Sequence, residues 1–433
     1  MSNTQETELE KKKRLKKVAT ATIVGSMLEW YDFYLYATMA SIVFAKVFFD
    51  TSDPGSASLK AFATFAIGFI ARPLGGLFFG YFGDKYGRKK VLFVTFLLMG
   101  LCTTAIGLIP TYESIGIWAA VLLVTFRIIQ GLGAGAEFAG AAITSYEHAS
   151  EDKRGSQGAW PALGLNLGLL LSSLTVFLLT LNGDEFLING GWRIPFIASA
   201  VLVIVGLWIR LKLHETPAFQ KVLDKQKEVN VPFKEVMTKH LPMLVLGTIA
   251  AICTFVVFYL TTVFALNWGT TQLGYSRAEF LKLQLIATLC FAAFIPLSAV
   301  LAEKFGRKTT SIAVCVLSAL FGLVFSSMLE SGNTFVVFLF LCIGLSIMGL
   351  TYGPIGTVLS EIFPISVRYT GSALTFNLAG IFGASFAPLI ATKLATTYGL
   401  HAVGYYLTAA SLLSLCAFLM IRETKNDDVN NQI

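Results

Sequence analysis

The chain carries the stretch Gly83-Asp84-Lys85-Tyr86-Gly87-Arg88-Lys89 and, 219 residues later, the near-copy Ala302-Glu303-Lys304-Phe305-Gly306-Arg307-Lys308. Each stretch lies between two long apolar runs. A second pair of landmarks follows in the same order, because Glu147 stands seven residues before Arg154 and Glu361 stands seven residues before Arg368. Two matched landmarks in the same order indicate a duplicated chain with two related halves.

The composition excludes an ordinary water-soluble domain. Of the 433 residues, 55% are hydrophobic and only 14% are charged, and the mean hydropathy is +0.69. Such a chain has too little polar surface to cover a globule in water. We therefore expect an integral, multi-pass membrane protein.

Twelve apolar stretches are each long enough to cross a bilayer, which takes about 20 helical residues. Their approximate extents are 18–45, 59–82, 91–110, 115–146, 157–181, 193–213, 241–267, 281–302, 309–328, 334–359, 370–395 and 402–421. The sequence thus predicts an all-α membrane protein with two pseudo-symmetric six-helix bundles, at 18–213 and 241–421. The remaining parts are a basic N-terminal segment (1–17), a linker (214–240) and a tail (422–433).

The basic residues of the connections predict the orientation. With the N-terminus inside, 25 Lys and Arg residues fall on the cytoplasmic side and five on the other. Basic loops are retained in the cytoplasm during insertion, so both termini are expected there. The run from Lys11 to Lys17 then acts as a topology anchor that meets anionic lipid. Neither nucleic acid nor an obligate protein partner is needed to explain the net charge of +7.

Several function classes lack their sequence signatures. The six cysteines are scattered singly, without CxxC pairs or interleaved His, so we expect neither a disulfide framework nor a metal site. No GxxxxGK[ST] phosphate loop is present, which disfavours an ATP-driven pump. The four histidines are isolated, and no catalytic constellation indicates an enzyme or a cofactor. A channel is disfavoured because pores usually rest on oligomeric filters or on rings of like charge, whereas this chain has two related halves with charges of both signs inside the spans.

The duplicated loop suits a tight, charged hinge at the cytoplasmic face. Gly87 and Gly306 allow the chain to reverse direction after a helix. The acids Asp84 and Glu303 can pair with a guanidinium or with a helix N-terminus in one conformational state. We therefore expect these loops to hold the two halves together reversibly.

This loop, repeated in the second half, resembles the signature of the major facilitator superfamily, and the resemblance covers essentially all twelve spans. It implies a cytoplasmic gate, called here the gate network, formed by Asp84, Arg88, Glu147, Arg154, Glu303, Arg307, Glu361 and Arg368. Two positions depart from the pattern: Glu303 replaces the usual aspartate, and Ala299 stands where the first half has Gly80. The second loop is thus expected to pack less closely.

A narrower resemblance lies in Glu29-Trp30-Tyr31-Asp32-Phe33-Tyr34, Ala71-Arg72-Pro73-Leu74-Gly75-Gly76, Arg127-Ile128-Ile129-Gln130-Gly131 through Glu137, and Gly191-Trp192-Arg193-Ile194-Pro195-Phe196. Together they look like the metabolite:proton symporter family. That family includes permeases for α-ketoglutarate, citrate, shikimate, proline and betaine. The resemblance implies secondary active transport coupled to protons, and a location in the inner (plasma) membrane of a bacterium.

Ionisable residues inside the spans are costly and usually mark a substrate or proton path. Glu29 and Asp32 share one face of span 1, and Arg127, Gln130 and Glu137 share a stripe on span 4. We expect Glu29, Asp32 or Glu137 to bind the driving proton, and Arg72 or Arg127, with Gln130, to bind a substrate carboxylate. The alternative is that Arg72–Asp32 and Arg127–Glu137 are static ion pairs, or that Glu137 is solvated at the interface.

Further candidates for substrate binding are neutral residues that can donate hydrogen bonds, although each could instead serve helix packing. They are Tyr31, Tyr36, Tyr259, Asn267 and Tyr352. The expected function is proton-coupled symport of a small organic acid by alternating access. Two alternatives remain open: uptake of a zwitterionic osmolyte such as proline or betaine, and proton-independent facilitation by the same fold.

Overall fold

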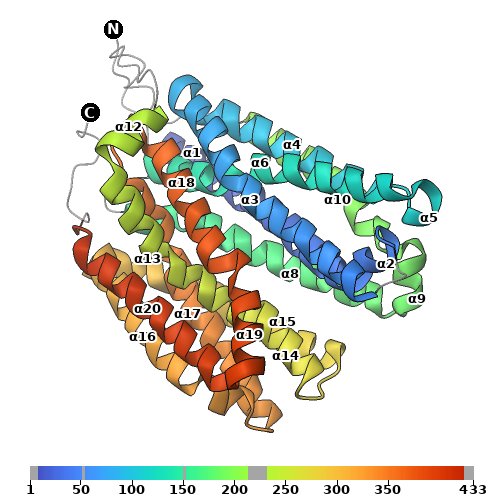
Figure 1. Cartoon of the computed structure of the whole chain (residues 1–433). Coiled ribbons are helices and arrows are strands. Elements are labelled where there is room, and N and C mark those ends of the chain that lie inside the picture. The colour runs from blue at the N-terminus through green and yellow to red at the C-terminus, as the bar shows by residue number, and fades with distance from the viewer. Residues whose placement is uncertain (1–7, 51–53, 150–152, 213–231, 424–433) are drawn as a thin grey trace.

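The computed structural model describes residues 8–50, 54–149, 153–212 and 232–423. The first half, running from blue to green in Figure 1, is a bundle of helices. Its elements, with π-helical segments written η, are α1 (Glu8–Met39), η1 (Ala40–Phe44), α2 (Ala45–Val47), α3 (Pro54–Tyr86), α4 (Arg88–Leu108), α5 (Tyr112–Ile115), α6 (Ile117–His148), α7 (Arg154–Gly158), α8 (Trp160–Thr180), α9 (Asp184–Phe186), η3 (Leu187–Gly191) and α10 (Arg193–Leu211).

The second half repeats this architecture. It begins with the short helix α12 (Pro232–Lys239). The elements that follow are α13 (Leu241–Tyr259), η4 (Leu260–Phe264), α14 (Ala265–Thr271), α15 (Arg277–Phe305), α16 (Arg307–Leu329), α17 (Thr334–Glu361), α18 (Arg368–Gly380), η5 (Ile381–Ser385), α19 (Ala387–Tyr398) and α20 (Leu400–Met420).

Each of the twelve predicted spans coincides with a long helix or with consecutive helices, which confirms the twelve-helix architecture. Within the described residues, 11 helices are long and apolar enough to cross a membrane. The remaining one is α1, which carries Glu29 and Asp32 and runs for 32 residues. The expected linker is described only from residue 232, and the expected N-terminal segment and tail lie largely outside the described residues.

The two halves meet at the end of the molecule where α12 and the hairpins α3–α4 and α15–α16 lie, called here the basic end (Figure 1). Contacts between halves join α3 and α6 to α18, and α7 and α8 to α15. The ribbons of the two halves spread apart towards the opposite end, which carries α2 and α9 in the first half and α14 and α19 in the second. The expected cytoplasmic location of the basic end stays a prediction.

The two signature hairpins turn on a single glycine each. Gly87, with φ of 109°, separates α3 from α4. Gly306, with φ of 100°, separates α15 from α16 in the same way. A side chain is rarely tolerated at such positive φ values. The predicted role of both glycines as reversal points is therefore confirmed.

Small residues let the helices of the first half approach closely. A Cβ atom added at Gly131 would overlap the carbonyl oxygen of Gly68, and one at Gly135 would overlap the carbonyl oxygen of Arg72. The backbones of α3 and α6 therefore touch along this line. Because Arg72 and Arg127 lie on these two helices and line one pocket, the close contact fixes the position of one side chain relative to the other.

Candidate functional site

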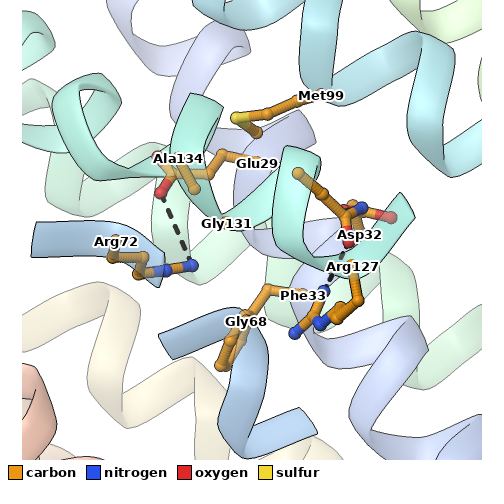
Figure 2. Close-up of a pocket in the computed structure, with 10 residues that line it drawn as sticks. Glu29, Asp32, Phe33, Gly68, Arg72, Met99, Arg127, Gly131 and Ala134 are labelled. Atoms are coloured by element: carbon orange, nitrogen blue, oxygen red, sulfur yellow. Dashed lines mark hydrogen bonds and ion pairs between the residues drawn. The ribbon is translucent and has the colours of Figure 1, made fainter. Parts of the chain in front are cut away.

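The site is a cluster of charged and polar side chains in the first half, built by three helices. A small pocket is lined by Glu29 and Asp32 from α1, Arg72 from α3, and Arg127 and Gln130 from α6 (Figure 2). All five residues are at least nine-tenths buried. The structure thus brings these five predicted residues together in the interior, and their roles in proton and substrate binding stay predictions.

Arg127 and Asp32 are joined through an amide rather than directly. The Arg127 guanidinium donates a hydrogen bond of 2.6 Å to Oε1 of Gln130. The Gln130 amide nitrogen donates in turn to a carboxylate oxygen of Asp32 and, at 2.9 Å, to the hydroxyl of Thr103. The second carboxylate oxygen of Asp32 is buried and has no hydrogen-bond partner in the described part of the chain.

Arg72 and Glu29 form a looser pair. The guanidinium nitrogen of Arg72 lies 3.9 Å from Oε1 of Glu29, which is an ion pair beyond hydrogen-bond distance. Both carboxylate oxygens of Glu29 are buried without a hydrogen-bond partner among the described residues. The partner of Arg72 is thus Glu29, so the alternative of an Arg72–Asp32 pair is wrong. This carboxylate is the least satisfied in the cluster.

Aromatic rings hold both guanidinium groups in place. The guanidinium carbon of Arg72 lies 4.8 Å from the ring centre of Phe33 and 4.9 Å from that of Phe69. That of Arg127 lies 4.0 Å from the Tyr36 ring and 5.6 Å from Phe33. These are cation–π distances. One ring, Phe33, therefore faces two positive charges.

Glu137 does not line the pocket, although it shares the predicted stripe with Arg127. Its carboxylate accepts a hydrogen bond of 2.8 Å from the hydroxyl of Thr95 and pairs with the guanidinium of Arg210 on α10. The alternative of an Arg127–Glu137 pair is therefore wrong, as is that of a solvated Glu137, which is completely buried.

Arg210 is the charged residue that sequence reasoning missed. It stands near the end of an apolar run and was counted with the cytoplasmic loop, but only 3% of it is exposed. Its guanidinium also donates to the carbonyl oxygen of Leu92 and lies 4.3 Å from the Phe96 ring centre. Gly25 on α1 leaves room for this guanidinium, because any side chain there would collide with it.

The five neutral candidates are distributed unevenly. Tyr36 donates a hydrogen bond of 2.6 Å to Thr64 beneath Arg127. Tyr31 packs in the apolar interior of the first half. Tyr259 and Tyr352 are buried on the second half, and both hydroxyls lack a partner in the described chain. Asn267 is exposed on α14 and does not line the pocket, so the structure does not bring it to the cluster.

The gate network joins the two halves at a helix N-terminus. This is one of the two kinds of partner expected for the acidic residues of the duplicated loops. Asp84 accepts hydrogen bonds from the backbone N–H groups of Tyr369 and Thr370, at 3.2 and 3.0 Å, and from the Thr370 hydroxyl at 2.7 Å. These residues begin α18 in the other half. The pseudo-symmetric Glu303 accepts a hydrogen bond of 2.7 Å from the N–H of Ser156 in α7.

Buried ion pairs complete the gate network. Glu147 lies 3.8 Å from a guanidinium nitrogen of Arg88 in its own half and 3.2 Å from one of Arg368 in the other. In the second half, Arg307 pairs with Glu361 at 3.4 Å. Arg154 and Arg368 both stack on the Tyr146 ring, at 5.3 and 5.6 Å. All eight predicted residues thus gather at the basic end.

Comparison with known proteins decides the family. The sequence profile of the Major Facilitator Superfamily matches residues 22–382 and also 286–432. The chain belongs to this superfamily. It is an integral, multi-pass membrane protein and a transporter rather than an enzyme, which confirms the sequence prediction.

Curated relatives match almost the whole chain. It is 45% identical over 419 residues to the inner membrane metabolite transport protein YhjE of Escherichia coli, covering 95% of each chain. Identity is 36% with the shikimate transporter of Escherichia coli, again covering 95% of each. With the proline/betaine transporter of Salmonella typhimurium it is 35%, covering 95% of this chain and 84% of the relative. The substrates in these names, shikimate, proline and betaine, are among those of the metabolite:proton symporter family that the sequence resembles.

A solved structure supports the fold. The proton:xylose symporter XylE, bound to 6-bromo-6-deoxy-D-glucose, superposes with a TM-score of 0.76 over 97% of this chain and 98% of its own. The two sequences are 19% identical, so the likeness concerns the fold alone.

Proposed function

We propose that this transporter carries a small organic acid into the cell together with a proton. The observation that carries the proposal is the unsatisfied Glu29 carboxylate beside the loosely held Arg72. A buried carboxylate without hydrogen bonds is destabilised in its charged form, so it is suited to take up a proton when its counter-ion is engaged elsewhere.

The coupling follows from the charges of the pair. Protonation of Glu29 removes the negative charge that faces Arg72 at 3.9 Å. The guanidinium is then available for two parallel hydrogen bonds with a substrate carboxylate. Binding of the anion to Arg72 in turn favours the protonated form of Glu29. The proton and the anion therefore bind together, and their charges compensate each other. Asp32, linked to Arg127 through Gln130, provides a second site of the same kind.

Glu137 takes another role in this proposal. Its carboxylate is paired with Arg210 and bonded to Thr95, which leaves it well satisfied in its charged form. We therefore assign Glu137 to holding α4, α6 and α10 together and place proton binding at Glu29, with Asp32 as the second candidate.

The aromatic rings favour an acid over a betaine. Quaternary ammonium groups are bound by cages of aromatic faces. Here the faces of Phe33, Phe69 and Tyr36 are already covered by guanidinium groups. A ligand with its own cation would meet two like charges at this place, whereas a carboxylate would be attracted.

The test is uptake into proteoliposomes of purified protein. Labelled shikimate and α-ketoglutarate, with glycine betaine for comparison, are followed with and without an inward proton gradient. We expect accumulation of an acid above its external concentration only with the gradient, and loss of accumulation but retention of exchange in Glu29→Gln. Accumulation of betaine alone would establish the osmolyte alternative, and gradient-independent equilibration would establish a facilitator. An unchanged accumulation by both Glu29→Gln and Asp32→Asn would refute the proton site.

A further inference from the structure

Four buried tyrosine hydroxyls in the described part of the chain lack a hydrogen-bond partner. One belongs to Tyr146, which packs against Arg154 and Arg368 of the gate network. The other three belong to Tyr34, Tyr259 and Tyr352, which are 7%, 1% and 1% exposed. None of the three hydroxyl oxygens has a partner within the described residues. A hydroxyl that is buried without a hydrogen bond costs about 1–3 kcal/mol. Three of them therefore destabilise the protein unless something else satisfies them.

The three tyrosines come from both halves and share one neighbourhood. Tyr34 lies on α1, Tyr259 ends α13, and Tyr352 lies on α17. Tyr34 is within electrostatic range of the other two hydroxyls and also of Arg72 and Glu29. Tyr352 is within electrostatic range of the same two charged groups. The trio thus borders the proposed proton and carboxylate site on the side of the second half.

The rings of the trio are fixed by aromatic packing. Tyr34 lies 5.4 Å from Phe258 across the boundary between halves, and Tyr259 lies 6.2 Å from Phe69 of the first half. Tyr352 has Phe138 of the first half at 6.4 Å and Phe291 at 6.1 Å. These contacts hold the rings without using the hydroxyls. The hydroxyls are therefore pre-positioned donors at a place where the halves meet.

We propose that Tyr34, Tyr259 and Tyr352 form a neutral subsite that binds a second oxygen function of the substrate while Arg72 holds its carboxylate. This inference rests on the proposed function and narrows it. The substrate is then a small carboxylate that also bears a hydroxyl, keto or second carboxyl oxygen. A plain monocarboxylate leaves the trio unsatisfied and binds more weakly.

The subsite also makes the second half part of substrate recognition. The charged cluster lies in the first half alone, so it would bind an anion equally in any arrangement of the halves. The hydroxyls of Tyr259 and Tyr352 move with the second half. A substrate that reaches them bridges the two halves.

The experiment measures equilibrium binding to purified full-length protein, by thermal shift and by calorimetry, without any gradient. The probes are matched pairs that differ only in hydroxyl groups: shikimate against 1-cyclohexene-1-carboxylate, which lacks its three hydroxyls, and lactate against propionate, which lacks its single hydroxyl. The variants are Tyr34→Phe, Tyr259→Phe and Tyr352→Phe. Tyr275→Phe serves as the control, because its hydroxyl contacts Thr334 at 3.3 Å near the protein surface.

We expect the wild type to prefer the more oxygenated member of at least one pair by about tenfold or more, which corresponds to one good hydrogen bond. Each of the three variants should reduce that preference at least threefold, and Tyr275→Phe should retain it. Phe removes the unsatisfied hydroxyl, so the variants should fold and remain at least as stable as the wild type. Wild-type binding without preference, or preference unchanged in all three variants, overturns the subsite and leaves the proposed symport standing. No binding of any carboxylate to the wild type overturns both.

Discussion

The carboxylate of Asp84 in the first half bonds to both the backbone N–H and the hydroxyl of Thr370 in the second, at 3.0 and 2.7 Å. A negative charge at a helix N-terminus is stabilising because the first N–H groups of a helix have no partner within it. Here the acid and the helix belong to different halves, so the stabilisation is present only while the basic end is closed. Gly80 permits the approach, since a Cβ there would lie 3.0 Å from the Cα of Thr370.

Asp84→Asn should weaken closure of the basic end. The amide keeps the shape and loses the charge, which removes about 2 kcal/mol of charge-assisted hydrogen bonding. Hydrogen exchange at the Tyr369 and Thr370 amides should accelerate by about tenfold or more. Glu423→Gln is the matched control, because Glu423 accepts from the N–H groups of Arg307 and Lys308 within one half, both at 3.0 Å. It should affect those amides alone. Unchanged exchange at Thr370 in Asp84→Asn would argue against a capping role.

Glu137→Gln should unfold at a lower temperature but still accumulate substrate. Removing one member of a buried ion pair strands the other, at about 3–5 kcal/mol. The double variant Glu137→Gln with Arg210→Met should recover part of the loss, because no unpaired guanidinium remains. Thermal unfolding in detergent and gradient-driven uptake measure the two properties separately. A stable Glu137→Gln that cannot accumulate substrate would instead identify Glu137 as the proton carrier.

Arg72→Lys should bind organic anions at least tenfold more weakly, although the charge is kept. A lysine cannot form two parallel hydrogen bonds with a carboxylate and stacks less well on Phe33 and Phe69. Calorimetric titration with the carboxylate that binds the wild type measures the change. Arg277→Lys, at an exposed position, should leave affinity unchanged. Equal affinities for Arg72→Lys and wild type would place the substrate carboxylate elsewhere.

Gly135→Ala should destabilise the first half by about 1–3 kcal/mol, because the new methyl group overlaps the carbonyl oxygen of Arg72 and pushes α3 from α6. Substrate affinity should fall as well, since the same shift displaces Arg72. Gly380→Ala is the comparison, because its Cβ would meet Phe255 at an ordinary 3.6 Å. The melting temperatures of the two variants measure the difference in stability. Equal values would contradict the close packing of α3 against α6.

Much of the site could be predicted because charges are rare in apolar spans. A charged side chain in hydrocarbon has to be explained by a partner, so Glu29, Asp32, Arg72 and Arg127 stood out from their surroundings. The gate residues stood out for another reason, since the duplication repeats them in order. Arg210 stood out on neither ground, because an arginine near a span end is usually solvated and the sequence alone does not reveal that it turns inward.

The sequence by itself determined the twelve helices, the two halves and which apolar spans carry Glu29, Asp32, Arg72 and Arg127, because these depend on hydrophobic length and on helical spacing along one segment. The tertiary structure decided the pairing. Whether Glu137 meets Arg127 or Arg210, and whether Arg72 meets Asp32 or Glu29, depends on how neighbouring helices are rotated and how closely their glycines allow them to approach. Such choices involve residues far apart in the chain, and the energy of a buried charge depends on distances that only the packed bundle fixes.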